Sequence, residues 1–362
     1  MSGGLAVVRS LGAARRSLTP AEIDDFEQEL IDQWCLALAA TGAVDSTVLQ
    51  ERAAIFEFAR FVARHVWTAL PQDADRWLGS LRQRGQAVST VRGKAGSVAR
   101  FFGFLDFRYQ GDIHALTGVV VGQPIDEFNR PAKTDYGAGR VPPPSEDVER
   151  LFTGWRASLP EARKYLPAAR DYVVASLWRR VGLRINETAM LDIRDWRPDL
   201  GPSGKLHVRF GKGSNGRGPK TRLVPGINAT DALLSWWLTD VRHQFGDDWE
   251  NPDAPLFPSE RRDPDTGRCT RVGTEALRRG LASATVRWLP DWDGHLTPHG
   301  LRHYCASSLY EQGVGLKAIQ ELLGHSWLTT TTLYVHVSDD HIERSWNQAN
   351  QRTTSRLIAV EE

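Results

Sequence analysis

The residues best suited to chemistry lie near the C-terminus, where imidazole, guanidinium and phenol side chains occur close together. The stretch reads Thr297-Pro298-His299-Gly300-Leu301-Arg302-His303, then Leu322-Leu323-Gly324-His325, then Thr332-Leu333-Tyr334. A phenol can attack phosphorus and form a covalent ester, a histidine can accept its proton, and a guanidinium can bind phosphate oxygens through two hydrogen bonds. These groups predict an enzyme that attacks a phosphodiester without a metal ion.

Short helices are expected to position these groups. Thr297 followed by Pro298 is typical of a helix start, and it places His299 and Arg302, three residues apart, on one side of the helix. Gly324 is a natural C-cap for the next helix, so His325 should follow a tight turn. A last short helix from Ser326 should then present Tyr334.

Five separated motifs between about 145 and 340 support this interpretation. They are Val181-Gly182-Leu183-Arg184-Ile185-Asn186-Glu187, Gly211-Lys212-Gly213 followed by Arg222-Leu223-Val224-Pro225, Leu296-Thr297-Pro298-His299-Gly300-Leu301-Arg302-His303, Leu322-Leu323-Gly324-His325-Ser326, and Thr331-Thr332-Leu333-Tyr334-Val335-His336-Val337. In this order they resemble the tyrosine recombinase (phage integrase) family, which includes the bacterial chromosome-dimer resolvases and phage and transposon integrases. The resemblance implies a site-specific recombinase that cuts and rejoins DNA through a covalent 3′-phosphotyrosine.

The predicted reaction starts at Tyr334. A phenol with a pKa of about 10 is a poor nucleophile at neutral pH, so it needs a base that accepts its proton. We assign this role to His299. The departing 5′ oxygen needs a proton, which we assign to Lys212 on a glycine-rich hairpin. This hairpin carries extra residues before Lys220, which is the alternative acid.

The transition state gathers negative charge on the phosphate oxygens, and cationic side chains should stabilise it. Arg184 and Arg302 are predicted to bind these oxygens through bidentate hydrogen bonds, and His325 to donate one more. Glu187 and His303 match family positions that support the pocket. One phosphodiester is exchanged for another, so no cofactor is expected.

The expected fold is mainly α-helical with a small antiparallel β-sheet (α+β). We predict a disordered arm (1–18), a helical DNA-binding domain (19–128), a linker (129–144), a catalytic domain (145–340) and a tail (341–362) that docks on a neighbouring subunit. The linker carries Pro142-Pro143-Pro144, which no helix continues through. Within the helical domain we expect helices over about 20–38, 46–70, 74–84 and 89–107.

Net charge is only +1, but basic residues are clustered. Six lie between Leu81 and Tyr109 against one acid, and six between Lys205 and Arg222 against none. Such a face can bind phosphates although the whole chain is nearly neutral. The alternative is a solvated helix face and a solvated hairpin. The predicted DNA-binding residues are Arg82, Arg84, Arg92, Lys94, Arg100, Arg217 and Arg222.

Composition is that of a globular protein, with 41% hydrophobic and 25% charged residues. Three scattered cysteines argue against a disulfide framework and fit a reducing cytoplasm. The family resemblance implies a cytoplasmic, nucleoid-associated protein. His295, His299 and His303, at four-residue spacing, leave a zinc hydrolase as one alternative; a type IB topoisomerase and a non-catalytic DNA-binding protein are two others. The expected partners are double-stranded DNA with a specific site, a homotetramer on that DNA and accessory recombination proteins.

Overall fold

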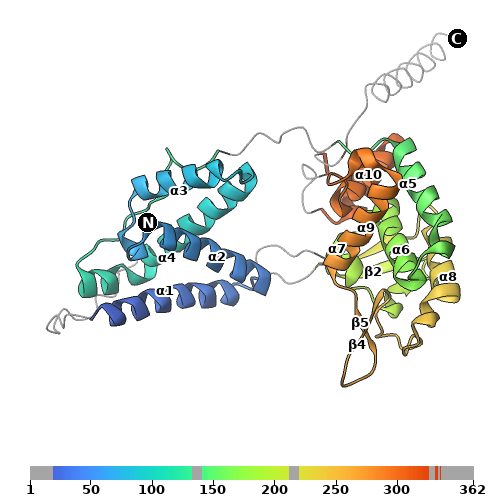
Figure 1. The fold of residues 1–362 in the computed structure, drawn as a ribbon, viewed down its shortest axis with the longest axis horizontal. Helices are drawn as coiled ribbons and strands as arrows, with labels where there is room; N and C mark the ends of the chain where they lie inside the picture. The colour runs from blue at the N-terminus through green and yellow to red at the C-terminus, as the bar shows by residue number, and fades with distance from the viewer. Residues whose placement is uncertain (1–18, 133–140, 212–219, 326–330, 333–334, 336–362) are drawn as a thin grey trace, which may run out of the picture. The chain divides into compact units, whose positions relative to one another are not determined.

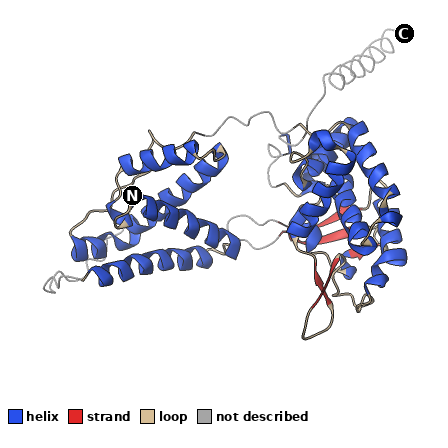
Figure 2. Cartoon of the chain, viewed as in Figure 1, coloured by secondary structure: helices blue, strands red, loops and turns tan. Residues whose placement is uncertain are grey.

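The computed structural model describes residues 19–132, 141–211, 220–325, 331–332 and 335 (Figure 1). The chain divides into two compact units, whose described residues are 19–132 in the first and the remainder in the second. Helices dominate both units, and the strands all lie in the second one (Figure 2). The predicted fold class, mainly α with small antiparallel sheets, is therefore confirmed. The predicted arm, the middle of the predicted linker and the tail lie outside the described residues.

The first unit is a bundle of four helices, α1 (Pro20–Ala40), α2 (Asp45–Val62), α3 (Pro71–Gln83) and α4 (Val88–Thr117), with a short 3-10 turn at Val66–Thr68. The start of α1 is as predicted: Thr19 accepts a hydrogen bond from the backbone of Glu22, and the Glu22 carboxylate accepts one from the backbone of Thr19. The apolar faces of these helices enclose one core, which is rich in aromatic side chains such as Trp77 and Phe101.

Two helix ends in this unit differ from the prediction. The helix expected over 46–70 ends at Val62, because Ala63 takes a left-handed conformation with φ 55° and stops the hydrogen-bond ladder. The helix expected to end near Phe107 continues to Thr117, where Gly118 provides the left-handed C-cap. Both errors concern helix ends, where periodicity gives the least information.

The second unit contains seven α-helices among its described residues, together with short 3-10 or π turns at 159–161, 193–195, 237–241, 242–245 and 290–292. The helices are α5 (Ser145–Ala157), α6 (Tyr165–Val181), α7 (Ile185–Ala189), α8 (Thr230–Trp236), α9 (Thr274–Trp288), α10 (Pro298–Glu311) and α11 (Leu316–Leu323). Helix α6 is buried along most of its length and packs against α5, α8, α9 and α10. Such a helix belongs at the centre of a domain, and it ends at Gly182, which has φ 64°.

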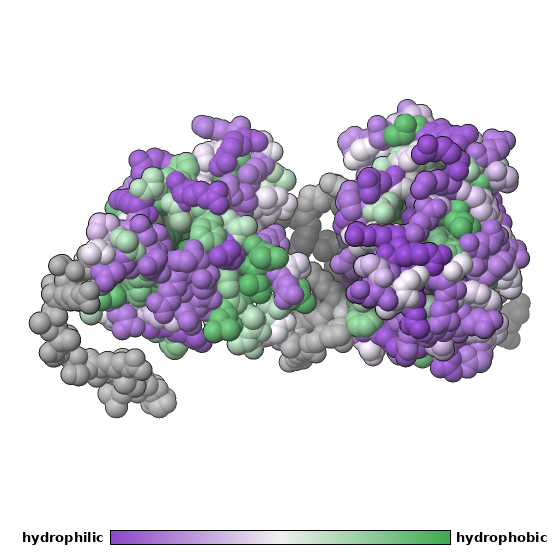
Figure 3. Space-filling view, turned by 60° about the horizontal axis from the view of Figure 1, so that its bottom comes forward, coloured by the Kyte–Doolittle hydropathy of each residue, from purple (hydrophilic) through white to green (hydrophobic). Residues whose placement is uncertain are grey.

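A three-stranded antiparallel sheet, in the order β1 (Trp196–Arg197), β2 (Lys205–Gly211), β3 (Lys220–Pro225), lies among these helices (Figure 2). The hairpin strands β2 and β3 were predicted, and Leu206 pairs with Val224 on the buried face. Strand β1 and the two-stranded sheet of β4 (Pro258–Arg262) and β5 (Cys269–Arg271) were not predicted. Figure 3 shows a mostly hydrophilic surface with apolar patches on the helical first unit.

Candidate active site

The centre of the candidate site is the carboxylate of Glu187 on α7, which is almost fully buried. Arg184 donates to it twice, from its backbone amide to Oε2 at 2.9 Å and from Nη1 to Oε1 at 2.7 Å. Arg222 on β3 donates from Nη1 and Nη2 at 2.9 and 2.8 Å, one bond to each oxygen. Arg302 on α10 lies slightly further away, with Nη1 4.0 Å from Oε2. Three guanidinium groups from three elements therefore surround one carboxylate.

The same three arginines bind the last carbonyl groups of α11. Arg222 Nε donates to the Leu322 carbonyl at 2.9 Å, Arg302 Nη2 to the Leu323 carbonyl at 2.6 Å, and Arg184 Nη2 makes a long contact of 3.5 Å with the Gly324 carbonyl. Carbonyl groups at a helix C-terminus lack intrahelical partners and carry the negative end of the helix dipole. Cationic side chains are therefore favoured there, and they fix the turn that leads into His325.

Charge dominates this cluster. Burial by itself would raise the pKa of Glu187, but the hydrogen bonds and charge of Arg222, together with those of Arg184, outweigh it and lower that pKa to about 2. Glu187 is therefore ionised at neutral pH. Three guanidinium groups against one carboxylate leave two positive charges in excess, which suits a site for a phosphate.

His325 follows the left-handed turn at Gly324 and is 7% exposed. Its Nε2 lies 3.0 Å from Arg302 Nη2, and its Nδ1 lies 3.0 Å from the Thr331 hydroxyl. A guanidinium can only donate hydrogen bonds, so Nε2 must accept one and the ring proton must reside on Nδ1, which donates to Thr331. Burial and the charges of Arg302, Arg184, Arg222 and His303 lower the pKa of His325 to about 3, so the ring is neutral in the DNA-free protein.

His299 lies in the first turn of α10, where Thr297 accepts a hydrogen bond from the Gly300 backbone at 3.1 Å, as the helix-start prediction required. The ring of His299 is exposed and contacts the ring of His303 edge to face, with 4.8 Å between centroids. His303 is half buried and is among the groups that lower the pKa of His325. These two histidines therefore extend the cluster from His325 toward solvent.

The model of the phage integrase family matches residues 156–341 of this chain. The chain belongs to the phage integrase family. It is 28% identical to tyrosine recombinase XerC of Vibrio vulnificus over 80% of each chain, and 29% identical to tyrosine recombinase XerC of Methylobacterium nodulans over 78% of this chain and 77% of that one. These similarities and the family match identify it as a tyrosine site-specific recombinase.

Solved structures of recombinases share the fold. XerH bound to a palindromic difH substrate superposes with a TM-score of 0.62 at 17% identity, covering 92% of this chain and 90% of that chain. The Tn1549 transposon integrase in complex with transposon right-end DNA gives 0.60 at 15% identity, covering 88% and 98%. A lambda integrase dimer on a core site gives 0.58 at 15% identity, covering 85% and 95%. At these identities the likeness concerns the fold alone.

The structure brings together four of the residues predicted for the recombinase site, Arg184, Glu187, Arg302 and His325. Lys212 and Tyr334 lie outside the described residues, so their roles stay predictions. Lys220 is exposed at the start of β3, opposite Gly211. A side chain at position 211 would place its Cβ 2.4 Å from the Lys220 carbonyl oxygen, so the hairpin needs glycine there.

Sequence reasoning missed two members of the cluster. Arg222 was assigned to DNA binding, yet its guanidinium binds Glu187 and the Leu322 carbonyl, and its side chain is only 13% exposed. Thr331, which fixes the ring of His325, was not singled out. The sequence did carry one signal for Arg222. This residue lies two positions after Lys220, on a strand whose alternation turns it inward beside buried Val208.

The other predicted DNA-binding residues differ in their surroundings. Lys94 and Arg100 bind the carboxylates of Glu57 and Glu51, and Arg84 lies 3.5 Å from Glu57. Their charges thus help to hold α4 and α3 against α2. Arg82 and Arg92 are exposed, and Arg217 lies outside the described residues. DNA contact stays a prediction for this set.

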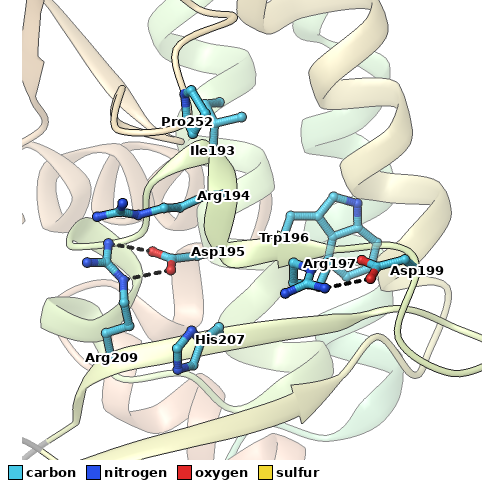
Figure 4. A pocket seen from close by; sticks show the side chains of 9 residues that line it. All are labelled: Ile193, Arg194, Asp195, Trp196, Arg197, Asp199, His207, Arg209 and Pro252. Atoms are coloured by element: carbon cyan, nitrogen blue, oxygen red, sulfur yellow. Dashed lines mark hydrogen bonds and ion pairs between the residues drawn. The ribbon is translucent and has the colours of Figure 1, made fainter.

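A cavity of about 660 Å³ lies beside β2, apart from the arginine cluster (Figure 4). It is lined by Ile193, Arg194, Asp195, Trp196, Arg197, Asp199, His207, Arg209 and Pro252. Each of its arginines is paired with an aspartate: Arg194 with Asp253 at 2.7 Å, Arg197 with Asp199 at 2.6 Å and Arg209 with Asp195 at 2.7 Å. The cavity is therefore close to neutral, and it differs in this from the cluster around Glu187.

Within the described part of the chain, no three His, Cys, Asp or Glu side chains are grouped as a metal site would require. Over the same residues, no helix combines the length and the apolar character needed to cross a membrane.

Proposed function

We propose that Tyr334 is the nucleophile of this recombinase and that the cluster around Glu187 binds the scissile phosphate. The observation that carries the proposal is the convergence of Arg184, the N-cap residue of α7, and Arg302 of α10 on the C-terminal end of α11, directly before His325. Residues 331 and 332 begin the segment that leads to Tyr334, and Thr331 already contacts His325. In the sequence Tyr334 follows Thr331 by only three positions, which supports a role for its phenol at this cluster.

In the cleavage step the phenolic oxygen of Tyr334 bonds to phosphorus, and the bond from phosphorus to the 5′ oxygen breaks. The phenol proton goes to His299, and Lys212, with Lys220 as the alternative, gives a proton to the departing 5′ oxygen. The product is a 3′-phosphotyrosine and a free 5′ hydroxyl. Attack of a 5′ hydroxyl from the partner strand reverses these events and rejoins the DNA.

The arginines act on the phosphate oxygens. Negative charge grows on these oxygens as the tyrosine attacks, and preorganised donors stabilise it without having to reorient. Arg302 is 1% exposed and is held by the carbonyls of Gly182 and Leu323, so its direction is fixed before DNA arrives. Arg184 is held by Glu187 in the same way.

The partner is double-stranded DNA with a specific recombination site, bound as a homotetramer with one dimer per site. Accessory recombination proteins and a cytoplasmic, nucleoid-associated location go with this activity, as does the absence of any cofactor requirement. We assign the segment 341–362 to docking on a neighbouring subunit. Deletion of residues 343–362 should then abolish pairing of two sites but preserve binding to one duplex; unchanged recombination by the deletion variant would exclude this role.

The experiment that tests the proposal is covalent trapping. A library of randomised duplexes, each nicked near its centre, is incubated with the protein, and protein–DNA adducts that survive denaturant are recovered and sequenced. The nick lets the short cleaved product diffuse away, so the adduct accumulates. Wild-type protein should recover one related set of sequences, and Tyr334→Phe should recover none.

Three outcomes would contradict the proposal. An adduct formed equally by Tyr334→Phe would place the nucleophile elsewhere. Tight sequence-specific binding with no adduct from wild-type protein would indicate a non-catalytic DNA-binding protein. Supercoil relaxation on the selected site without exchange between two duplexes would instead indicate topoisomerase-like chemistry with the same nucleophile.

A further inference from the structure

The guanidinium group of Arg222 is fully used for contacts within the cluster. All three of its donor nitrogens are engaged: Nη1 and Nη2 by Glu187, and Nε by the Leu322 carbonyl. It approaches the turn at Gly324 so closely that a Cβ there would lie 3.0 to 3.1 Å from its Cδ, Nε and Nη1 atoms. Arg222 is therefore enclosed between α7 and the end of α11.

These contacts saturate the carboxylate of Glu187. A carboxylate offers about four acceptor positions. Here Arg184 fills two through its backbone amide and Nη1, and Arg222 fills the other two. Arg302 is consequently left 4.0 Å from Glu187 and directs its Nη2 to Leu323 and His325 instead. Without Arg222, Glu187 would have two vacant acceptor positions facing two predicted catalytic arginines.

Arg222 also connects the site to the lysine-bearing hairpin. It lies on β3 two residues after Lys220, and β3 pairs with β2, whose last residue Gly211 precedes Lys212. Since Arg222 binds both Glu187 and α11, it fixes the base of this hairpin against the elements that carry the other cationic groups.

We propose that Arg222 is a positioning residue of the recombination reaction, which acts by occupying Glu187 and anchoring the β2–β3 hairpin to the end of α11. This inference rests on the proposed function of the cluster. It replaces the expectation that Arg222 contacts DNA. The two roles predict different losses: a phosphate contact affects affinity and its salt dependence, whereas a positioning role affects the rate of cleavage in the bound complex.

The first test compares Arg222→Lys and Arg222→Met with wild type on a nicked duplex recovered by covalent trapping. Lysine keeps the charge but cannot make two parallel hydrogen bonds to Glu187. We expect DNA affinity within about threefold of wild type and adduct formation, under saturating protein, slower by about 10- to 100-fold in both variants. A loss confined to affinity, with a salt slope reduced by about one, would show that Arg222 contacts phosphate instead.

Arg209→Lys is the matched control. Arg209 lies on the neighbouring strand β2, is 21% exposed and is paired with Asp192 and Asp195, outside the cluster. It should lose thermal stability as the Arg222 variants do, but the folded protein should cleave at the wild-type rate. Equal slowing by Arg209→Lys would mean that any weakened ion pair in the sheet slows cleavage, and the specific role of Arg222 would be rejected.

The second test asks whether Arg222 acts through Glu187. Cleavage rates are measured for Arg222→Met, Glu187→Gln and the double variant. If Arg222 acts by occupying the carboxylate, removing the charge of Glu187 should recover part of the loss, so the double variant should be faster than the product of the two single effects. Independent effects that multiply would contradict the proposal.

The third test needs no DNA and separates the inference from the proposed function. The full-length protein with ¹³C-labelled glutamate carboxyl groups is titrated from pH 8 to pH 4. The Glu187 resonance should stay at its ionised position in wild type, whose Glu187 pKa is about 2. It should move in Arg222→Met, because the side chain that lowers this pKa most is lost. An unchanged resonance in the variant would overturn the pairing. Failure of wild type to trap any duplex would refute the recombinase chemistry but leave this titration result standing.

Discussion

The ring of His325 offers the sharpest test of the site geometry. In the structure Arg302 donates to Nε2, so the neutral ring carries its proton on Nδ1, and Nδ1 donates a hydrogen bond to the Thr331 hydroxyl oxygen 3.0 Å away. Thr331→Val removes the acceptor with little change in shape. Thr331 is fully buried and His325 is 7% exposed, so water has poor access to replace the lost bond.

The size of the effect follows from that burial. Loss of the acceptor for a buried N–H costs about 1–3 kcal/mol. We therefore expect Thr331→Val to lower the free energy of unfolding by about 2 kcal/mol, a change of roughly 30-fold in the folding equilibrium. Cleavage should fall as well, since the ring is no longer held toward Arg302. Thr331→Ser keeps the hydroxyl, so it should retain both properties and serves as the matched control.

Two measurements check this prediction. Urea unfolding gives the stability change, and ¹⁵N NMR of labelled histidine distinguishes the Nδ1–H from the Nε2–H form of the ring. A wild-type ring protonated on Nε2 would refute the hydrogen-bond assignment directly. A stability loss in Thr331→Val no greater than that in Thr331→Ser would show that the hydroxyl contact contributes nothing.

Three further predictions concern the same cluster. Arg184→Lys should slow cleavage about 10- to 100-fold at nearly unchanged DNA affinity in a single-turnover assay, because the ammonium cannot bind Glu187 and a phosphate together. Gly182→Ala should lower the free energy of unfolding by about 2–4 kcal/mol in urea, since position 182 has φ 64° and a new Cβ would lie 2.4 Å from Leu323 Cδ2. Acid should destabilise the protein in two stages. The pKa of His325 is lowered from 6.5 to about 3 by folding, so the unfolded chain binds this proton more readily and stability falls below pH 6.5. The pKa of Glu187 is lowered from 4.5 to about 2, so stability falls further below pH 4.5. Urea unfolding between pH 8 and pH 4 should therefore show falling stability, with the first stage absent from His325→Gln; stability that rises toward acid would contradict both assignments.

The helical elements were largely predictable because their signals are local. The capping box at Thr19 and Glu22, the proline-led start of α10 and the left-handed glycines at 182 and 324 each fix a helix end within a few residues. The helix end at Ala63 was missed because a non-glycine residue takes the left-handed conformation there. Strand β1 was missed because two residues are too short for alternation to register.

The site was predictable only in part, because its decisive contacts are not local. Arg184, Arg302 and His325 stood out by residue type and motif order. The partners of these residues did not: Arg302 binds the carbonyl of Gly182, which is 120 positions away in the sequence, and Arg222 binds that of Leu322, 100 positions away. Every residue has a backbone carbonyl group. The sequence therefore does not distinguish an arginine that binds such carbonyls from one that faces solvent.

The C-terminal end of α11 explains how three guanidinium groups can lie close together around Glu187. Three guanidinium groups this close repel one another, and the single carboxylate of Glu187 compensates only one of them. The remaining compensation comes from the carbonyls of Leu322, Leu323 and Gly324, which the left-handed turn at Gly324 directs outward at the negative end of a helix dipole. The described cluster thus keeps an excess of positive charge in the folded protein, and under our proposal the scissile phosphate compensates it. A change that spares every arginine but removes the turn, Gly324→Ala, should therefore impair phosphate binding, because a Cβ there would lie 3.0 Å from Arg222 Cδ and φ 67° would be strained.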